Sequence, residues 1–158
     1  SRHLVEGMVM NNQLTDFSFR PTLQGDPVAN RRQAGRRPMS SMAPTIVFRR
    51  EEPVLAVGSP GGRSIPHLLS RVLLASLVWK EPPHRAVGLP HLSSRRNGLV
   101  LEGDPPLPWP VGMDQLSGDQ QSVRLQPIGS GIALVQHLGD QWTGAADPRR
   151  EGTALALP

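Results

Sequence analysis

The stretch "TIVFRREEPVLAVGSPGGRSIPHLL", residues 45–69, predicts two strands, a glycine-rich loop and a helix in immediate succession. Apolar and β-branched residues dominate 45–48 and 54–57, which is typical of strands. The charged corner Arg49–Glu52 lies between them and favours a turn, so the two strands are expected to pair as a hairpin. This succession indicates a layered protein in which helices pack on a sheet.

The helix is expected to begin after Ser64, which can act as its N-cap. Pro66 suits the first turn, because the missing N–H of proline is not needed there. Apolar residues then recur with helical spacing, at 65, 68, 69 and 72. The pair Pro82-Pro83 prevents continuation, so we expect the helix to end before "KEPPH".

Elsewhere the chain alternates between strands and long loops. "HLVEGMVMNN" near the start and "NGLVLEG" in the middle are predicted as strands, and further strands are expected over Val123–Pro127, Ile132–Leu138 and Gln141–Ala145. Gln13–Met42 is expected to be a long loop, which is either functional or disordered, and Asp104–Gly118 is expected to hold one helical turn at most. This order of elements predicts a layered α/β or α+β fold, in one domain over residues 1–158.

Composition excludes several classes of function. The net charge is only +4, aromatic residues make up 4% of the chain and tyrosine is absent, so the arginines have no stacking platform for nucleic acid beside them. Without cysteine there is no disulfide or thiolate metal site, and the five histidines show no metal-ligand spacing, so no metal is expected. The longest apolar stretch is too short to span a bilayer.

The loop "GSPGGRS" permits three interpretations: a phosphate cradle, an oxyanion hole, or a simple strand-to-helix turn. The consecutive glycines Gly61 and Gly62 allow backbone N–H groups to converge on one anion, and the following helix adds a favourable dipole. Only Arg63 and Ser64 follow, where a P-loop would have Lys and Ser or Thr, so phosphate binding is disfavoured. The oxyanion hole and the simple turn remain open.

Two polar motifs precede this loop. In "NNQLTDFS", Gln13 and Asp16 lie three residues apart and could together bind an ammonium group, although Asn and Asp are also typical of loop caps. In "RRPMSSMAPT", Ser40 and Ser41 offer two hydroxyl donors for a carboxylate, although a surface turn fits them as well.

The order of these motifs is more specific than any one of them. "NNQLTDFS", "GRRPMSSMAPTIVF", "VLAVGSPGG" and "ADPRREG" together resemble the γ-glutamyltransferase (γ-glutamyltranspeptidase) family. The similarity is to the C-terminal part of the small catalytic subunit, strong over Asn11–Gly62 and Gln141–Gly152 and thinner over Ile65–Gln136.

The resemblance implies a fold and an activity. The family belongs to the autoprocessed N-terminal nucleophile hydrolases, so the resemblance implies an α+β fold and the chain is expected to be a fragment of their four-layer αββα sandwich. These glutathione hydrolases and acyltransferases form a γ-glutamyl-enzyme ester on a threonine, then pass the group to water or to an amino acid or peptide. By position, Gln13 and Asp16 match the residues that hold the substrate's α-amino group, and Ser40 and Ser41 those of its α-carboxylate. Gly61 and Gly62 match the oxyanion hole.

The same resemblance predicts what lies outside this sequence. The nucleophilic threonine, and the large subunit of the same precursor with its substrate-binding arginine, have no counterpart here, so we expect the fragment alone to be inactive. The expected ligands are glutathione and other γ-glutamyl compounds, with no cofactor and no nucleic acid. A periplasmic or secreted location is expected from bacterial members of the family.

Two alternatives remain. A related acylase acting on glutaryl-type β-lactam side chains would bind a substrate without an α-amino group, which leaves Gln13 and Asp16 without a purpose. A non-catalytic, basic binding remnant would agree with the arginine content and the missing nucleophile.

Overall fold

The computed structural model describes residues 3–95, 97–103 and 122–156. The chain divides into two compact units, Ser1–Ser40 and Ser41–Pro158, and each is described by itself. The helical turn considered for Asp104–Gly118 lies outside the described residues. No helix among the described residues is both long and apolar enough to cross a membrane.

The first unit consists of short hairpins around one 3₁₀ turn. The prediction of one continuous strand in "HLVEGMVMNN" is wrong, because β1 (Leu4–Val5) and β2 (Met8–Val9) pair as an antiparallel hairpin. Glu6 and Gly7 both have positive φ, 50° and 80°, which is the turn geometry of a two-residue hairpin. The 3₁₀ helix η1 and a second hairpin follow, with bounds Gln13–Asp16 for η1, Thr22–Leu23 for β3 and Asp26–Pro27 for β4.

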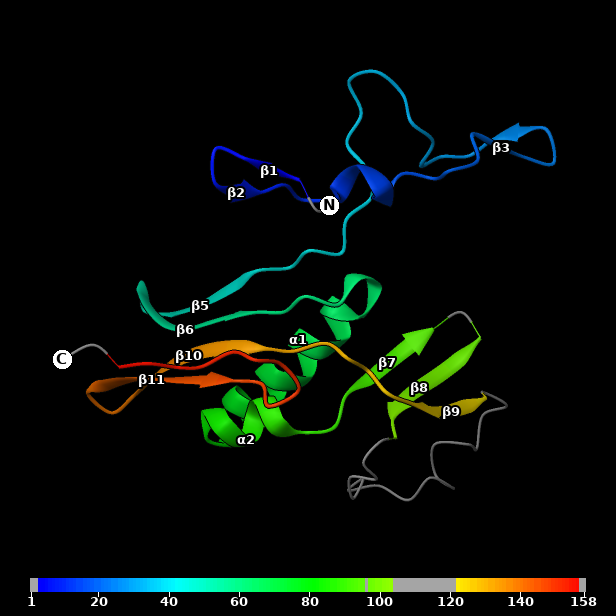
Figure 1. The fold of residues 1–158 in the computed structure, drawn as a ribbon. Coiled ribbons are helices and arrows are strands. Elements are labelled where there is room, and N and C mark those ends of the chain that lie inside the picture. Colours follow the sequence, from blue (N-terminus) through cyan, green and yellow to red (C-terminus); the bar gives the residue numbers. More distant parts are fainter. Residues whose placement is uncertain (1–2, 96, 104–121, 157–158) are drawn as a thin grey trace. The chain divides into compact units, whose positions relative to one another are not determined.

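The second unit is built on a four-stranded antiparallel sheet in the order β11-β10-β6-β5 (Figure 1). The predicted hairpin is confirmed as β5 (Thr45–Arg49) and β6 (Glu52–Gly58). Its turn residues Arg50 and Glu51 have φ of 49° and 72°. The predicted C-terminal hairpin is confirmed as well, and its strands are Ala133–Leu138 for β10 and Gln141–Ala146 for β11.

Helices cover one face of this sheet. The predicted helix is confirmed as α1 (Ile65–Leu73), preceded by the 3₁₀ turn η2 (Gly62–Ser64) and extended by the π-helical turn η3 (Leu74–Val78). A second helix, α2 (Pro83–Gly88), was not predicted. The buried core joins apolar side chains of the sheet and both helices, among them Leu55, Val57, Leu134, Leu68, Leu69, Val72, Ala86 and Val87.

A second, three-stranded sheet lies beside α1. The expected strand in "NGLVLEG" is confirmed as β8 (Gly98–Glu102), and Val123–Pro127 corresponds to β9 (Val123–Gln126). β7 (Leu92–Arg95) was not predicted, and it pairs antiparallel to β8 while β9 pairs parallel to it.

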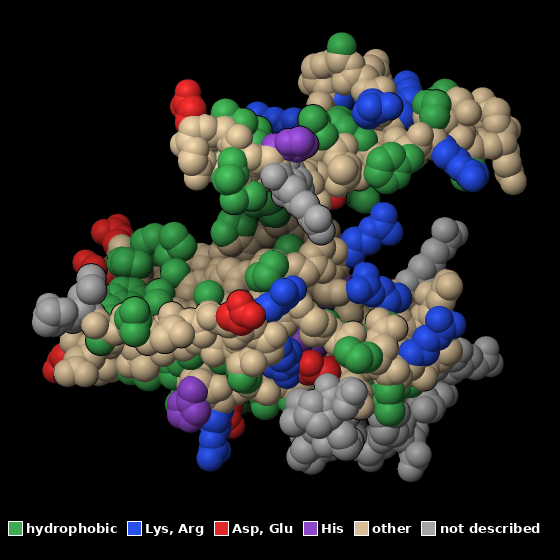
Figure 2. Space-filling model, viewed as in Figure 1, with side chains coloured by type: hydrophobic (Ala, Val, Ile, Leu, Met, Phe, Trp, Pro, Cys, Tyr) green, Lys and Arg blue, Asp and Glu red, His purple; other side chains and the backbone are tan. Residues whose placement is uncertain are grey.

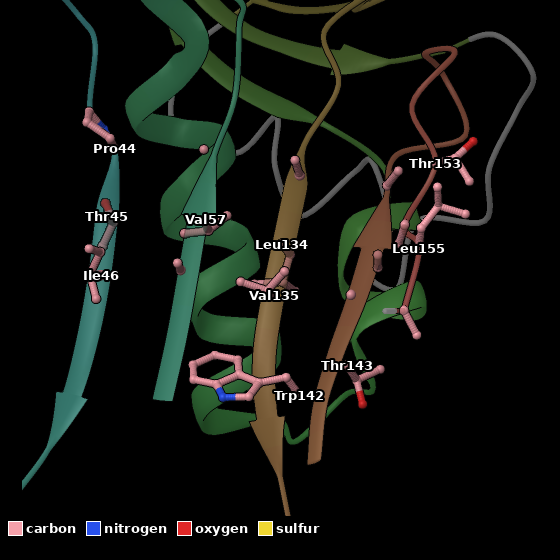
Figure 3. A pocket seen from close by; sticks show the side chains of 18 of the residues that line it. Pro44, Thr45, Ile46, Val57, Leu134, Val135, Trp142, Thr143, Thr153 and Leu155 are labelled. Carbon is pink, nitrogen blue, oxygen red and sulfur yellow. The ribbon is translucent and has the colours of Figure 1, made fainter. Parts of the chain in front are cut away.

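The other face of the four-stranded sheet carries a groove (Figure 3). Cross-strand pairing places Ile46, Ala56 and Val135 on this face, opposite the helices. The groove has a volume of about 1020 Å³, and Trp142 and Leu155 contribute to its lining. Ile46 and Trp142 remain 59% and 52% exposed, which is unusual for large apolar residues on a sheet. Hydrophobic side chains gather on the surface over β5 and β6 in Figure 2.

Candidate active site

The glycine pair forms an exposed turn between β6 and α1. Gly61 has φ of +137° and Gly62 of +56°, conformations that side-chain-bearing residues rarely adopt. The carbonyl of Gly61 accepts a hydrogen bond from the amide of Ser64 at 3.2 Å, and that of Gly62 accepts one from Ile65. Within the described residues no hydrogen bond uses the amide N–H of Gly61 or Gly62. Two donors are therefore available at the start of a helix, where negative charge is favoured.

Two serines from distant parts of the sequence hold this turn. The Ser59 hydroxyl donates to the carbonyl of Gly131 at 2.7 Å and lies 3.1 Å from the Ser130 hydroxyl. The Ser130 hydroxyl in turn donates to the carbonyl of Pro60. A Cβ atom on Gly61 would lie 2.5 Å from Ser130 Oγ, so the approach of Ser130 requires glycine at this position.

Ser64 does not cap α1 as expected. Its backbone is already helical, at φ −83° and ψ −17°, and its hydroxyl makes no hydrogen bond to the helix amides. Instead Ser64 Oγ accepts hydrogen bonds from Arg95 Nη2 at 2.6 Å and from the Ser93 hydroxyl at 3.3 Å. The 3₁₀ turn that begins at Gly62 takes over the first part of the helix, which is why a capping side chain is not needed.

Gln13 and Asp16 form the two ends of η1. In a 3₁₀ helix residues i and i+3 eclipse one another, so these two side chains emerge on the same side. Asp16 is exposed and Gln13 half-buried. The turn is held by the Thr15 hydroxyl, which donates to the carbonyl of Asn12 at 2.7 Å, and by the amide of Gln13, which donates to Asn11 Oδ1 at 3.1 Å.

The predicted site residues fall into both units. Gln13, Asp16 and Ser40 belong to the first unit, whereas Ser41 and the glycine pair belong to the second. Within the first unit the Asn30 side chain bonds both the backbone of Asp16 and the residue before Ser40. The structure thus links the first three predicted residues within one small body.

A buried ion cluster, formed by His91, Glu102, Asp147 and Arg149, was missed as a site in the sequence. Arg149 Nε and Nη2 donate to the two oxygens of Glu102 at 2.5 and 2.6 Å, and Nη1 donates to Asp147 Oδ1 at 2.8 Å. Arg149 also donates to the last two carbonyls of α2, those of Val87 and Gly88 at 3.4 and 3.5 Å, and to that of the C-cap residue Leu89 at 3.0 Å. The motif "ADPRREG" was the available signal, since it contains both Asp147 and Arg149.

His91 connects this cluster to the glycine turn. Its Nδ1 lies 3.2 Å from Arg71 Nη2, and because a guanidinium can only donate, Nδ1 accepts this hydrogen bond and Nε2 is the ring nitrogen that donates. Nε2 is 3.2 Å from the carbonyl of Ser130 and 3.5 Å from Asp147 Oδ2. Burial, together with the charge of Arg149, lowers the pKa of Arg71 to about 10.

The ion cluster makes the stability of the folded state depend on pH. Burial opposes the ionisation of Asp147, but hydrogen bonds from His91 and Arg149 outweigh it and lower its pKa from 3.8 to about 2. A carboxyl with a lowered pKa stabilises the folded state above its unfolded pKa, and this stability is lost as the pH falls from about 4 to about 2. The pKa of Glu102 is lowered in the same way: burial acts to raise it, and the bonds from Arg149 and His91 outweigh that effect.

We therefore expect the Asp147→Asn variant to lose roughly 2 kcal/mol of stability at pH 7 and to show a flatter decline between pH 4 and 2. Thermal unfolding followed by circular dichroism across this pH range measures both effects. Asp140→Asn, which removes an exposed carboxyl from the β10–β11 turn, is the matched control and should keep the profile of the parent. An Asp147→Asn profile as steep as that of the parent would contradict the assignment.

Metal ligation has no support among the described residues. No group of three or more His, Cys, Asp or Glu side chains there could hold a metal ion. The arrangement offers instead two backbone donors for an anion and, on the first unit, a carboxylate and an amide on one side of a turn.

Comparison with known proteins defines the class. The family model for gamma-glutamyltranspeptidase matches residues 1–157, so the chain belongs to the γ-glutamyltranspeptidase (glutathione hydrolase) family. This confirms the family resemblance found in the sequence motifs. The glutathione hydrolase proenzyme of Bacillus subtilis strain 168 is 31% identical over 154 residues, which cover 96% of this chain and 25% of the relative. That of Pseudomonas sp. strain A14 is 38% identical, covering 96% of this chain and 29% of the relative.

Solved structures agree in fold. Gamma-glutamyltranspeptidase from Pseudomonas nitroreducens, complexed with L-DON, superposes with a TM-score of 0.79 at 25% identity and covers all of this chain and 87% of the solved one. The T380A mutant of Helicobacter pylori gamma-glutamyltranspeptidase gives 0.75 at 30% identity, covering 92% of this chain and 83% of the solved one. The chain therefore has the mixed helix and strand fold, mostly sheet, of this family. It spans about a quarter of the length of the curated relatives.

Proposed function

We propose that this chain is the C-terminal part of the small catalytic subunit of a γ-glutamyltransferase. The assembled enzyme cleaves γ-glutamyl amides such as glutathione and transfers the γ-glutamyl group to water or to an amino acid or peptide. The observation that carries the proposal is the exposed turn at Gly61 and Gly62, whose two unused amide N–H groups lie at the start of α1. Its place in the family's order of motifs supports the same role.

The glycine turn stabilises charge during the chemical step. A threonine hydroxyl supplied from outside this chain attacks the γ-glutamyl carbonyl carbon, and the carbonyl oxygen becomes an oxyanion that accepts from Gly61 and Gly62. The C–N bond then breaks, the amine leaves with a proton, and a γ-glutamyl ester remains. Water or an acceptor amine attacks this ester through a second oxyanion at the same donors. One such donor contributes roughly a hundredfold to the rate.

Four polar side chains recognise the α-amino and α-carboxylate groups of the substrate. Asp16 and Gln13 accept hydrogen bonds from the α-ammonium group, and the hydroxyls of Ser40 and Ser41 donate to the α-carboxylate. The common side of η1 from which Asp16 and Gln13 emerge supports the first assignment. The proposal includes one domain for residues 1–158.

The exposed face of the four-stranded sheet is the place where the remainder of the enzyme packs. We expect the groove lined by Ile46, Val135 and Trp142 to be covered by a second sheet, which would complete an αββα sandwich of the N-terminal nucleophile hydrolase type (Figure 3). The relatives named proenzymes are about four times as long as this chain, whereas the solved chains are close to it in length. Both observations support a precursor that is divided into subunits, and the location proposed for it is periplasmic or secreted.

The test uses the complete precursor and γ-glutamyl-p-nitroanilide. We expect the precursor to hydrolyse this substrate and the 158-residue chain alone to leave it intact. The Asp16→Ala variant of the precursor should raise KM by about 10- to 100-fold, because a charge-assisted hydrogen bond to the ammonium group is lost. Asp26→Asn, which changes an exposed carboxyl of β4, is the matched control and should leave KM unchanged.

The same experiment separates the glutaryl acylase alternative. An enzyme that binds the α-amino group prefers the γ-glutamyl anilide to the glutaryl anilide. The Asp16→Ala substitution should remove much of that preference. A precursor that prefers the glutaryl anilide, or whose KM is insensitive to Asp16→Ala, would overturn the proposed function.

A further inference from the structure

The side chain of Asn30 lies between the two substrate-recognition motifs of the first unit. Its Nδ2 donates to the carbonyl of Asp16 at 2.7 Å, and its Oδ1 accepts from the amide of Met39 at 3.0 Å. Its own carbonyl accepts from the amide of Ser18 at 2.9 Å. One residue thus bonds the end of η1, the segment after it, and the residue that precedes Ser40.

These bonds matter because the first unit has little apolar packing to fix its geometry. Phe17 is its only buried apolar residue among those described. The two hairpins of this unit are each only two residue pairs long. The bonds of Asn30 close loops of 14 and 9 residues, and an amide side chain can donate and accept at once. Polar links, rather than packing, therefore set the distance between η1 and Ser40.

We propose that Asn30 is a positioning residue that sets the spacing between the ammonium-binding pair, Gln13 and Asp16, and the carboxylate-binding Ser40. This inference rests on the proposed function, since it assumes that those residues bind the α-amino and α-carboxylate groups. Asn30 itself contacts neither group. It makes the site selective for ligands that carry both charges on one carbon atom.

The physical reason is that an α-amino acid head presents its two charges at a fixed separation. A site with the matching separation binds both at once, and a site whose two halves move independently must order them when the ligand binds. Loss of Asn30 therefore weakens the binding of ligands that contact both the ammonium-binding pair and Ser40. A ligand with the carboxylate but no amino group engages one half only and is little affected.

The test compares two competitive inhibitors of the complete precursor: L-glutamate, and glutarate, which is the same diacid without the amino group. In Asn30→Ala the Ki of glutamate should rise about five- to tenfold, as expected for the loss of one hydrogen bond or slightly more, while the Ki of glutarate changes less than twofold. KM for γ-glutamyl-p-nitroanilide should rise in parallel with the Ki of glutamate, and kcat should be nearly unchanged. Gln33→Ala, which truncates an exposed amide of the same unit, should change none of these constants.

A conservative variant keeps the inference testable if Asn30→Ala folds poorly. Asn30→Asp retains the acceptor for the Met39 amide and loses the donor to the Asp16 carbonyl, so it should still raise the Ki of glutamate selectively. Equal losses for glutamate and glutarate, or a lowered kcat with unchanged KM, would show a merely structural role and overturn the inference. An Asn30→Ala variant that keeps the parent's ratio of the two Ki values, glutarate to glutamate, would also overturn the inference.

Failure of the inference is distinguishable from failure of the proposed function. If Asp16→Ala weakens glutamate binding and Asn30→Ala does not, only the positioning role is wrong. If Asp16→Ala has no effect on glutamate, the proposed ammonium site is wrong and the inference about Asn30 falls with it.

Discussion

Replacing Gly61 by alanine in the complete precursor is expected to lower kcat at least about 100-fold, the usual cost of a lost oxyanion donor. Two features of the turn make this replacement severe. At φ +137° a side-chain-bearing residue is strained, and the new Cβ would lie 2.5 Å from Ser130 Oγ and 3.1 Å from Ser130 Cβ. The turn must move away from Ser130, and the amide N–H groups move with it. Initial-rate kinetics with γ-glutamyl-p-nitroanilide measure the loss.

The neighbouring glycine provides a matched control. A Cβ on Gly62 meets nothing within 4 Å, so Gly62→Ala suffers only the backbone strain of φ +56°, about 1 kcal/mol. Gly62→Ala should therefore lose much less activity than Gly61→Ala. Adding Ser130→Gly to Gly61→Ala removes the collision and should restore part of kcat. An active Gly61→Ala enzyme, or one as mildly affected as Gly62→Ala, would argue against this geometry.

Replacing Arg149 by methionine is expected to cost about 3 kcal/mol of stability or more, the typical cost of breaking a buried ion pair from one side. The change leaves Glu102 and Asp147, which are 4% and 2% exposed, without their shared cation. It also removes the guanidinium bonds to the carbonyls of Val87 and Leu89 at the C-terminal end of α2. Urea unfolding followed by tryptophan fluorescence measures the change in the free energy of unfolding.

Arg150→Met is the matched control, because it removes an adjacent arginine that is exposed. It should cost less than about 0.5 kcal/mol, as is usual for surface positions. Arg149→Lys should fall between the two, since an ammonium group keeps the charge but cannot donate to both carboxylates in the planar geometry of a guanidinium. Equal stability of the Arg149→Met and Arg150→Met variants would contradict the role assigned to the ion cluster.

The sheet could be predicted where local sequence and tertiary structure agree. The hairpins of β5 with β6 and of β10 with β11 were expected from apolar runs separated by charged or Gly-Asp corners, and both are present. α2 was missed because Pro82-Pro83 was interpreted only as a helix breaker, although Pro83 is also suited to the first position of a new helix. In "HLVEGMVMNN" the spacing of apolar residues concealed the turn at Glu6-Gly7.

The site was predictable to the extent that it is local. The glycine turn and the three-residue spacing of Gln13 and Asp16 are visible in the sequence, whereas the 3₁₀ helix over Gln13–Asp16 was not expected in a segment predicted as a loop. The partners of the turn were not predictable, because Ser130 lies about 70 residues away. The ion cluster likewise joins the residue before β7, the end of β8 and the segment after β11, and only packing brings these together.

The distance along the chain between the glycine turn and its supports also orders events in time. Ribosomes release a polypeptide from its N-terminus, and domains fold as their segments emerge. Gly61 leaves the ribosome long before Ser130, and Ser130 leaves it before Asp147. Both Ser130 and Asp147 contact Nε2 of His91. The turn therefore acquires its final shape only after the segment through Asp147 has been synthesised.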